Sequence, residues 1–357
     1  MCAPWKTGLA LLLPILIKTR TMTHAEPINW SALSPLPDQL GFAGMYAGVS
    51  NGAVVAMGGA NFPDKYPWEG GQKKWYDSIY VLPPDGNWIH LDEKLADASG
   101  YGVSVSYQNK LIAVGGCSEK ELLSSVGCYE WSNGRLKKDP LPSLPHPLAY
   151  MTGAVLGNAL LILGGARNLA GAPTKTALLL DLQAAEKGWQ PLKPWPGPER
   201  TLPVCGVWND QLFLMGGTTS CVTSAGQKYQ HTLLDNYSLT LTKTRRGWSA
   251  SWKTLVPIPR GVSAAGTLPL VSNSRFVIWG GVDAVTAQFR TPQNHPGLTR
   301  SVLFYYPDSD SWEYWGEQHT YPSRVTLPVI PYQNGWLYVS GEVKPGIRTP
   351  SIIKLNS

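Results

Sequence analysis

The chain of 357 residues has few charged side chains and almost no helix-period patterns. Asp, Glu, Lys and Arg make up 15% of the sequence, whereas about a quarter is usual in a soluble protein. The net charge is +6, but no run of Lys or Arg is dense enough for nucleic-acid binding, so we exclude that class of partner. Two interpretations of the positive charge stay open: a mildly basic secreted protein, or a surface that faces an anionic small ligand.

Long apolar runs are scarce as well. A short one, Gly8–Ile17, follows Lys6 and is too short to span a bilayer, but it suits the hydrophobic region of a signal peptide. Ala25 ends an acceptable cleavage site, although basic residues after the apolar run depart from the usual pattern. We expect residues 1–25 to be a signal peptide and residues 26–357 to be exported, to the periplasm, with no membrane attachment afterwards.

The sequence contains only five cysteines, and Cys2 would leave with the signal peptide. The other four allow three disulfide pairings in an exported protein. Spacing favours the local pairs Cys117–Cys128 and Cys205–Cys221, and free buried thiols are the alternative. No Cys/His cluster has the spacing of a zinc site, so we predict no structural metal.

What the sequence does contain is a repeat. Short apolar runs end in a glycine pair every 50 to 64 residues or so, and the last run ends in Ser-Gly. The six pairs are Gly58-Gly59, Gly115-Gly116, Gly164-Gly165, Gly216-Gly217, Gly280-Gly281 and Ser340-Gly341. Such a period indicates one supersecondary unit copied six times.

One unit can be divided into four predicted strands. Residues 154–157, 160–165 and 175–181 form the first three, and Trp189 opens a fourth before a Pro-rich segment. Tryptophans recur at the matching place in other units as Trp88, Trp131, Trp252 and Trp312. Four antiparallel strands repeated in this way predict an all-β propeller of six blades. The pattern resembles the kelch repeat family.

The sixth unit lacks its last strand. After Gly341 only residues 351–355 suit a strand, whereas residues 28–33 at the other end of the chain carry a Trp strand followed by a Pro-rich segment. We therefore expect the N-terminal strand to complete the C-terminal blade and close the ring.

The loops after the glycine pairs should share one face with the blade junctions, because two antiparallel strands separate them. Arginine is prominent among these residues, and its planar fork suits carboxylates. At the Pro-rich junctions, Arg200, Arg260 and Arg324 could instead hold turns together by binding carbonyl groups. The candidates for substrate contact on this face are Glu69, Lys73, Arg167, Arg200 and Lys344.

The last loop, residues 341–349 (GEVKPGIRT), carries the most specific signal. Pro345-Gly346 predicts a turn that folds Glu342 back toward Arg348. The pair would place a carboxylate acid/base beside a fixed positive charge, and a purely structural salt bridge is the alternative.

Four blocks of the chain resemble the N-acetylneuraminate epimerase family, exported six-bladed kelch propellers also called sialic acid mutarotases. The blocks are GEVKPGIRT, GFAGMYAGVSNGAVVAMGGANF, EGGQKKWYDSIYVL and GYGVSVSYQNKLIAVGG. The first is similar to the family's catalytic loop, which implies that Glu342 is the acid/base and Arg348 the essential arginine. Its place at the end of the chain resembles the cyclically permuted subgroup. Cys117 departs from the acidic residue typical there.

The resemblance implies interconversion of the α and β anomers of N-acetylneuraminate by ring opening and closing, with no metal or organic cofactor. Three alternatives stay open. A kelch ring can be a non-catalytic module that binds a glycan or a protein, and a mutarotase could act on another keto sugar acid. A sialidase would be expected to carry Asp-box repeats, which the sequence lacks.

Overall fold

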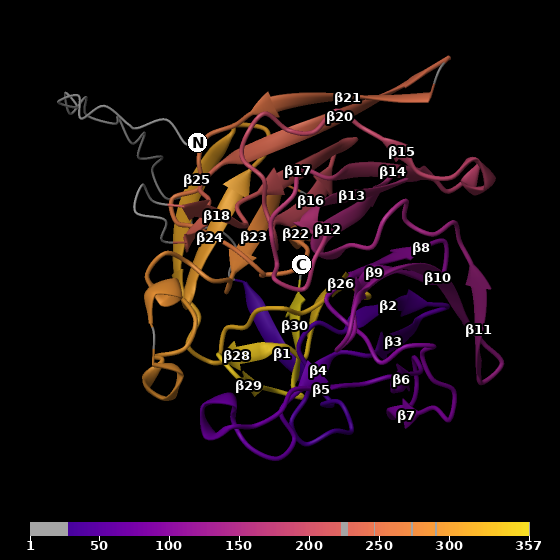
Figure 1. Ribbon diagram of the computed structural model, residues 1–357, viewed down its shortest axis with the longest axis vertical. Coiled ribbons are helices and arrows are strands. Elements are labelled where there is room, and N and C mark those ends of the chain that lie inside the picture. Colours follow the sequence, from indigo (N-terminus) through magenta and orange to yellow (C-terminus); the bar gives the residue numbers. More distant parts are fainter. Residues whose placement is uncertain (1–27, 223–227, 246, 273, 290, 357) are drawn as a thin grey trace.

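The computed structural model describes residues 28–222, 228–245, 247–272, 274–289 and 291–356, and the expected signal peptide lies outside them. Six four-stranded antiparallel sheets stand around a central axis (Figure 1). The predicted all-β six-bladed propeller is therefore confirmed. In the described part of the chain, helix is limited to the short 3-10 turns η1 (Pro67–Glu69), η2 (Ala185–Lys187), η3 (Thr286–Gln288) and η4 (Pro292–Asn294), none of which has the length to cross a membrane.

The blades follow the chain in order, and each begins with its innermost strand. Blade 1 contains β2 (Tyr46–Ser50), β3 (Ala53–Met57), β6 (Ile79–Leu82) and β7 (Ile89–His90); blade 2 contains β8 (Val103–Tyr107), β9 (Lys110–Cys117), β10 (Leu122–Ser132) and β11 (Arg135–Pro140); blade 3 contains β12 (Ala149–Leu156), β13 (Ala159–Ala166), β14 (Ala177–Asp181) and β15 (Gln190–Pro191). Blade 4 contains β16 (Val204–Trp208), β17 (Gln211–Met215), β20 (Asn236–Thr244) and β21 (Gly247–Thr254); blade 5 contains β22 (Leu270–Val271), β23 (Arg275–Trp279), β24 (Ser301–Tyr306) and β25 (Ser311–Glu317); blade 6 contains β26 (Val329–Pro331), β27 (Gly335–Val339), β30 (Ile352–Asn356) and β1 (Asn29–Leu33).

Blade 6 is built from both ends of the chain, as the sequence predicts. Strand β1 pairs antiparallel with β30, from Asn29 opposite Asn356 to Leu33 opposite Ile352. Trp30 of β1 packs on Trp279 of blade 5, with ring centroids 4.7 Å apart. The N-terminal strand thus covers an edge that the sixth blade would otherwise expose.

The recurring tryptophans and the Pro-rich segments tie neighbouring blades together. Four fourth-strand indoles donate a hydrogen bond from Nε1 to a carbonyl oxygen in the Pro-rich segment of the preceding blade. The bonds run from Trp88 to Ser34, Trp189 to Pro142, Trp252 to Lys193 and Trp312 to Val256, at 2.8 to 3.2 Å. A large apolar ring with one polar edge suits this place between sheets.

Near the axis, a closed circle of backbone hydrogen bonds joins all six blades. One residue at each junction has φ between 51° and 71°, and its N–H donates to the carbonyl oxygen of the equivalent residue in the preceding blade, at 2.6 to 2.9 Å. These ring residues are Gly44, Tyr101, Tyr150, Leu202, Ala264 and Thr326. A non-glycine residue in this region carries a strain of about 1 kcal/mol or more, which the circle of bonds offsets.

The glycine pairs, at the ends of the second strands, connect neighbouring blades close to the ring residues. The second glycine of each pair has φ between 86° and 107°, a region that L side chains disfavour. In five blades its N–H donates to a carbonyl oxygen of the next blade at 2.8 to 2.9 Å. The donors are Gly59, Gly116, Gly165, Gly217 and Gly341.

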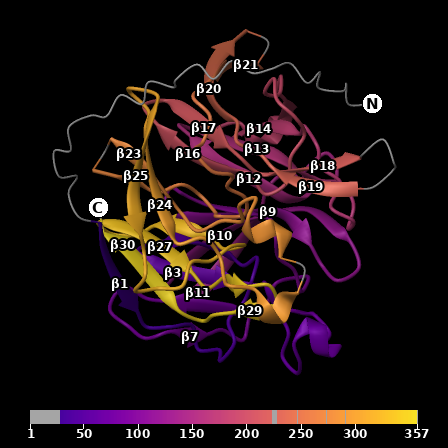
Figure 2. The same ribbon diagram turned by 90° about the vertical axis from the view of Figure 1, so that its left-hand side faces the viewer.

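The residue after each second glycine pairs with the residue just before a ring residue, so the glycine loops and the blade junctions share one face, as expected. We call these six places the mouth positions: Ala60, Cys117, Ala166, Thr218, Val282 and Glu342. Small two-stranded sheets extend beyond three of them: β4 (Ala60–Asn61) with β5 (Lys74–Trp75), β18 (Thr218–Val222) with β19 (Lys228–Thr232), and β28 (Glu342–Lys344) with β29 (Ile347–Arg348). Figure 2 shows β18, β19 and β29 on the side away from β1 and β30.

The favoured disulfide pairings are wrong. Cys117 lies opposite Leu122 and Cys128 lies opposite Ile112, because the hairpin between β9 and β10 turns directly after Cys117, earlier in the chain than a Cys117–Cys128 pair requires. Cys117, Cys128 and Cys205 are free thiols, and the side chain of Cys221 lies outside the described residues. The free-thiol alternative therefore describes these three cysteines.

Candidate active site

The loop after Ser340-Gly341 forms the hairpin that the sequence predicts. Glu342 lies directly opposite Arg348 in the β28–β29 pair. Gly346 makes the turn with φ of 81°, and a Cβ there would lie 2.6 Å from Cγ of Pro67. The hairpin is therefore packed tightly against the blade 1 loop, which fixes the two side chains relative to each other.

Arg348 and Glu342 form a largely buried ion pair. Nη2 of Arg348 lies 2.8 Å from Oε2 of Glu342, and the two side chains are 5% and 20% exposed. The guanidinium also lies over the ring of Phe62, 4.8 Å from its centroid. Nε and Nη1 of Arg348 are buried and have no hydrogen-bond partner among the described residues. Buried donors without acceptors are rare and costly, so this guanidinium is arranged to receive an acceptor from outside.

The pKa of Glu342 is raised above its ordinary value, mainly because burial disfavours the ionised carboxylate. The charges of Arg348 and Lys73 and the backbone N–H of Gly346 oppose this effect without cancelling it. A carboxyl group tuned in this way can exchange a proton closer to neutral pH than an exposed glutamate.

Lys73 is the third predicted residue that the structure brings to this place. Its ammonium lies over two aromatic rings, 4.5 Å from the centroid of Trp75 and 4.3 Å from that of Tyr101. Burial raises the pKa of both Glu342 and Cys117, and the Lys73 charge opposes that effect at each of them. Lys73 therefore lies between the mouth positions of blades 6 and 2.

Arg200 holds its blade junction together, which is the alternative to substrate contact that the sequence left open. Its side chain is fully buried and makes a bidentate pair with Asp235, with N–O distances of 2.6 and 2.8 Å. It also donates to the carbonyl of Gly216, the first glycine of its blade. Arg260 and Arg324 make the same type of contact with the carbonyls of Gly280 and Ser340.

The remaining three candidates lie apart from the ion pair or face another loop. Glu69 is exposed and accepts the backbone N–H of Tyr66 at the start of its own short helix. Arg167 is exposed on the blade 3 loop, where its charge lowers the pKa of His146. Lys344 belongs to β28, and its Cε is 4.0 Å from where a Cβ on Gly297 would lie.

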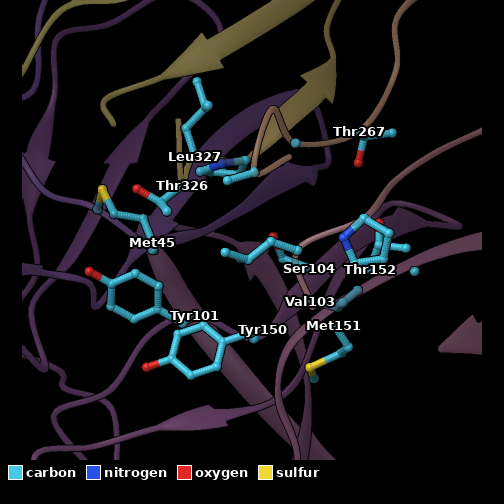
Figure 3. A pocket seen from close by; sticks show the side chains of 18 residues that line it. Met45, Tyr101, Val103, Ser104, Tyr150, Met151, Thr152, Thr267, Thr326 and Leu327 are labelled. Atoms are coloured by element: carbon cyan, nitrogen blue, oxygen red, sulfur yellow. The ribbon is translucent and has the colours of Figure 1, made fainter. Parts of the chain in front are cut away.

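A narrow cavity of about 90 Å³ lies on the axis below the mouth. It is lined by ring residues and by the innermost strands, including Ser104 and Thr152, and Glu342 and Arg348 are not among its lining residues. Figure 3 shows Tyr101 and Tyr150 side by side at one edge of this cavity, with both hydroxyls directed away from Ser104 and Thr152. The candidate site therefore lies at the open mouth rather than inside the channel.

Sequence reasoning missed the roles of Phe62 and Tyr150. Phe62 stands within a block that the family resemblance covers, but nothing in its spacing indicates a contact with Arg348. Tyr150, in β12, is the ring residue equivalent to Tyr101, which lies just before β8, so aligning the six units at the blade junctions would have placed it on the mouth beside Tyr101.

The fold and the site define a six-bladed propeller with a largely buried carboxylate–guanidinium pair at its mouth. Residues 14–137 match the N-acetylneuraminate epimerase family model. An N-acetylneuraminate epimerase of Salmonella enteritidis is 35% identical over 133 residues, and one of Haemophilus influenzae is 35% identical over 127 residues. Over this segment, about a third of its length, the chain is similar to the N-acetylneuraminate epimerase family.

These sequence matches cover 33% and 31% of this chain and about a third of each relative, 34% and 33%. The family-model match ends at residue 137 and so does not include the Glu342–Arg348 hairpin, whose resemblance to a catalytic loop stays a prediction. The solved structure of YjhT aligns over 91% of this chain and 97% of its own, with a TM-score of 0.65 and 15% identity. That likeness shows the fold alone.

Proposed function

We propose that this protein is a mutarotase that interconverts the α and β anomers of N-acetylneuraminate. The observation that carries the proposal is the state of the Arg348 guanidinium. Its side chain is only 5% exposed, yet Nε and Nη1 have no hydrogen-bond partner among the described residues, although the group lies beside Glu342. A sugar acid supplies the two things this arrangement lacks: an anionic carboxylate for the arginine, and an anomeric hydroxyl for the glutamate.

The chemistry follows from the properties of Glu342. As a carboxylate it accepts the proton of the anomeric hydroxyl while the bond between the anomeric carbon and the ring oxygen breaks and a second acid or water protonates the ring oxygen. As a carboxylic acid it returns that proton to the keto oxygen when the ring closes on the other face. Its raised pKa keeps both protonation states accessible. Arg348 and Lys73 hold the carboxylate and stabilise negative charge that develops during opening.

The test is to dissolve the pure α anomer and to follow the anomer ratio by NMR with and without the protein. We expect faster relaxation to the same equilibrium ratio, and Glu342→Gln should lose at least about 100-fold of the protein-dependent rate. Glu93→Gln, the same chemical change at an exposed position, is the matched control. An unchanged relaxation rate with the wild-type protein would remove the proposal.

Each of the two alternative functions predicts a different result in the same experiment. Binding of N-acetylneuraminate, seen as a thermal shift, without faster relaxation would indicate a glycan-binding module. Faster relaxation of a different keto sugar acid, with no effect on N-acetylneuraminate, would change the substrate but keep the mechanism.

We also propose that the blades of this chain follow a cyclically permuted order relative to most of the family, and that the protein is exported. A permuted order explains why a linear match ends near residue 137 although the blades continue. Comparing the N-terminal residue of the protein from a periplasmic fraction with Glu26 tests whether residues 1–25 are removed as a signal peptide.

A further inference from the structure

Tyr150 and Cys117 form a polar pair at the mouth that the proposed mechanism has not used. Cys117 is the mouth position of blade 2, and its side chain is fully buried. Its thiol donates a hydrogen bond to the phenol oxygen of Tyr150, with 3.5 Å between Sγ and Oη. The two residues come from neighbouring blades and meet only because the ring brings their junctions together.

This pair lies beside the candidate site through Lys73. The Lys73 ammonium lies 4.3 Å from the centroid of Tyr101, and the rings of Tyr101 and Tyr150 are 5.5 Å apart. The Lys73 charge acts on the pKa of both Cys117 and Glu342. Tyr101 therefore connects Lys73, whose charge acts on Glu342, to the Tyr150 ring in the next blade.

The hydroxyl of Tyr150 has a proton to give. The thiol occupies its oxygen as donor, and the phenol hydrogen has no acceptor among the described residues. Burial raises the pKa of Tyr150, so the phenol stays protonated over the working pH range. Figure 3 shows the hydroxyl pointing away from the cavity lining, on the same side as that of Tyr101.

We propose that Tyr150 is the second catalytic residue of the site, the acid that protonates the ring oxygen of the sugar, and that the Cys117 thiol positions it. This inference rests on the proposed mutarotase function. During opening, Glu342 takes the proton of the anomeric hydroxyl, the ring C–O bond breaks with its electron pair moving to the ring oxygen, and Tyr150 protonates that oxygen. During closing, the same hydroxyl returns its proton to the Tyr150 phenolate as its oxygen attacks the keto carbon, and Glu342 protonates the keto oxygen.

Both groups end the cycle in their starting states, so no further reactant is needed. The phenolate that exists between the two steps accepts the hydrogen bond from the Cys117 thiol and lies beside the ring of Tyr101, which carries the Lys73 ammonium on its face. The thiol therefore acts through Tyr150, and a hydroxyl at position 117 can replace it as a donor whereas a methyl group cannot.

The experiment measures the α-anomer relaxation rate of the full-length protein and of four variants: Tyr150→Phe, Cys117→Ala, Cys117→Ser and Tyr107→Phe. Tyr107 is the matched control, because its hydroxyl bonds Asn158 at the far end of the blade from the mouth. We expect Tyr150→Phe to lose about 100-fold in kcat, with a smaller change in KM. The apparent pKa on the acidic side of its pH–rate profile, which we assign to Glu342, should not change.

Cys117→Ala should lose about three- to tenfold in kcat, Cys117→Ser should recover most of that loss, and Tyr107→Phe should match the wild type. A Tyr150→Phe variant with the wild-type rate would overturn the inference and leave the mutarotase function intact. Equal losses in Cys117→Ala and Cys117→Ser would overturn the positioning role of the thiol. If the wild-type protein does not speed relaxation, the function and this inference both fall.

Discussion

Replacing Glu342 with Gln should make the protein more stable at neutral pH while it removes activity. The carboxylate is 20% exposed and its pKa is raised, which means that the folded state disfavours its charge despite the 2.8 Å contact with Arg348. Active sites commonly keep such unfavourable groups because the chemistry needs them.

The magnitude follows from two opposing effects. Burial of an ionised carboxylate costs several kcal/mol, and Gln removes that cost. Gln keeps an acceptor for Nη2 of Arg348 but exchanges a charged hydrogen bond for a neutral one, which loses roughly 1 kcal/mol. Because part of the carboxylate remains solvated, we expect a net gain of about 1 to 2 kcal/mol in the free energy of unfolding near pH 7.

The sign of the pH dependence is fixed by the raised pKa. Glu342 contributes stability that is fully present below its ordinary pKa of 4.5 and is lost as the pH rises through its folded value. The stability advantage of Glu342→Gln over the wild type should therefore grow from about pH 4 to about pH 7. Urea denaturation at both pH values measures it, with Glu93→Gln as the control. A variant less stable than the wild type near pH 7, or an advantage that does not change with pH, would refute the reasoning.

Three further substitutions test the fold around the site by urea denaturation. Gly346→Ala should cost about 1 to 2 kcal/mol more than Gly134→Ala, because both glycines have positive φ but only the first meets Pro67; equal costs would count against tight packing of the hairpin. Arg324→Ala should lower stability by at least about 2 kcal/mol, because the carbonyls of Ser340 and Ser351 lose their shared donor. Trp30→Ala should cost about 3 kcal/mol by emptying the contact with Trp279 that closes blade 6, and a cost near zero would contradict a closing role for β1.

The fold could be predicted because its signals are local and repeated. Each glycine pair marks a backbone conformation that other residues avoid, and most of the recurring tryptophans lie in or beside a fourth strand. Trp131 was wrongly matched to them, because it lies in β10, the third strand of blade 2. The incomplete sixth unit then required the strand containing Trp30 as its partner, which the pairing with β30 confirms. The disulfide pairings failed because register, not spacing, decides which residues face each other, and Cys128 lies opposite Ile112.

The site could be predicted only where its residues are close in sequence. Glu342 and Arg348 belong to one hairpin, so a turn at Pro345-Gly346 was enough to bring them together. Lys73 was one of several basic residues on the expected face, and nothing in the chain distinguished it from Arg167. The difference appears only when the blade 1 loop folds over the mouth and places the Lys73 ammonium on the ring of Tyr101.

The six mouth positions differ in their side chains, and this difference is the reason we place the proposed chemistry at blade 6. Five of them hold Ala, Cys, Thr or Val, and only Glu342 can ionise at low pH. The ring itself is held by backbone bonds that do not depend on these side chains, so one position can carry a buried carboxylate without weakening the other blade contacts. Cys117 lies two blades away at the equivalent place, and its thiol is committed to Tyr150. In the proposed mechanism, the same backbone position therefore supplies the proton acceptor in blade 6 and the orienting donor in blade 2, with the mouth between them.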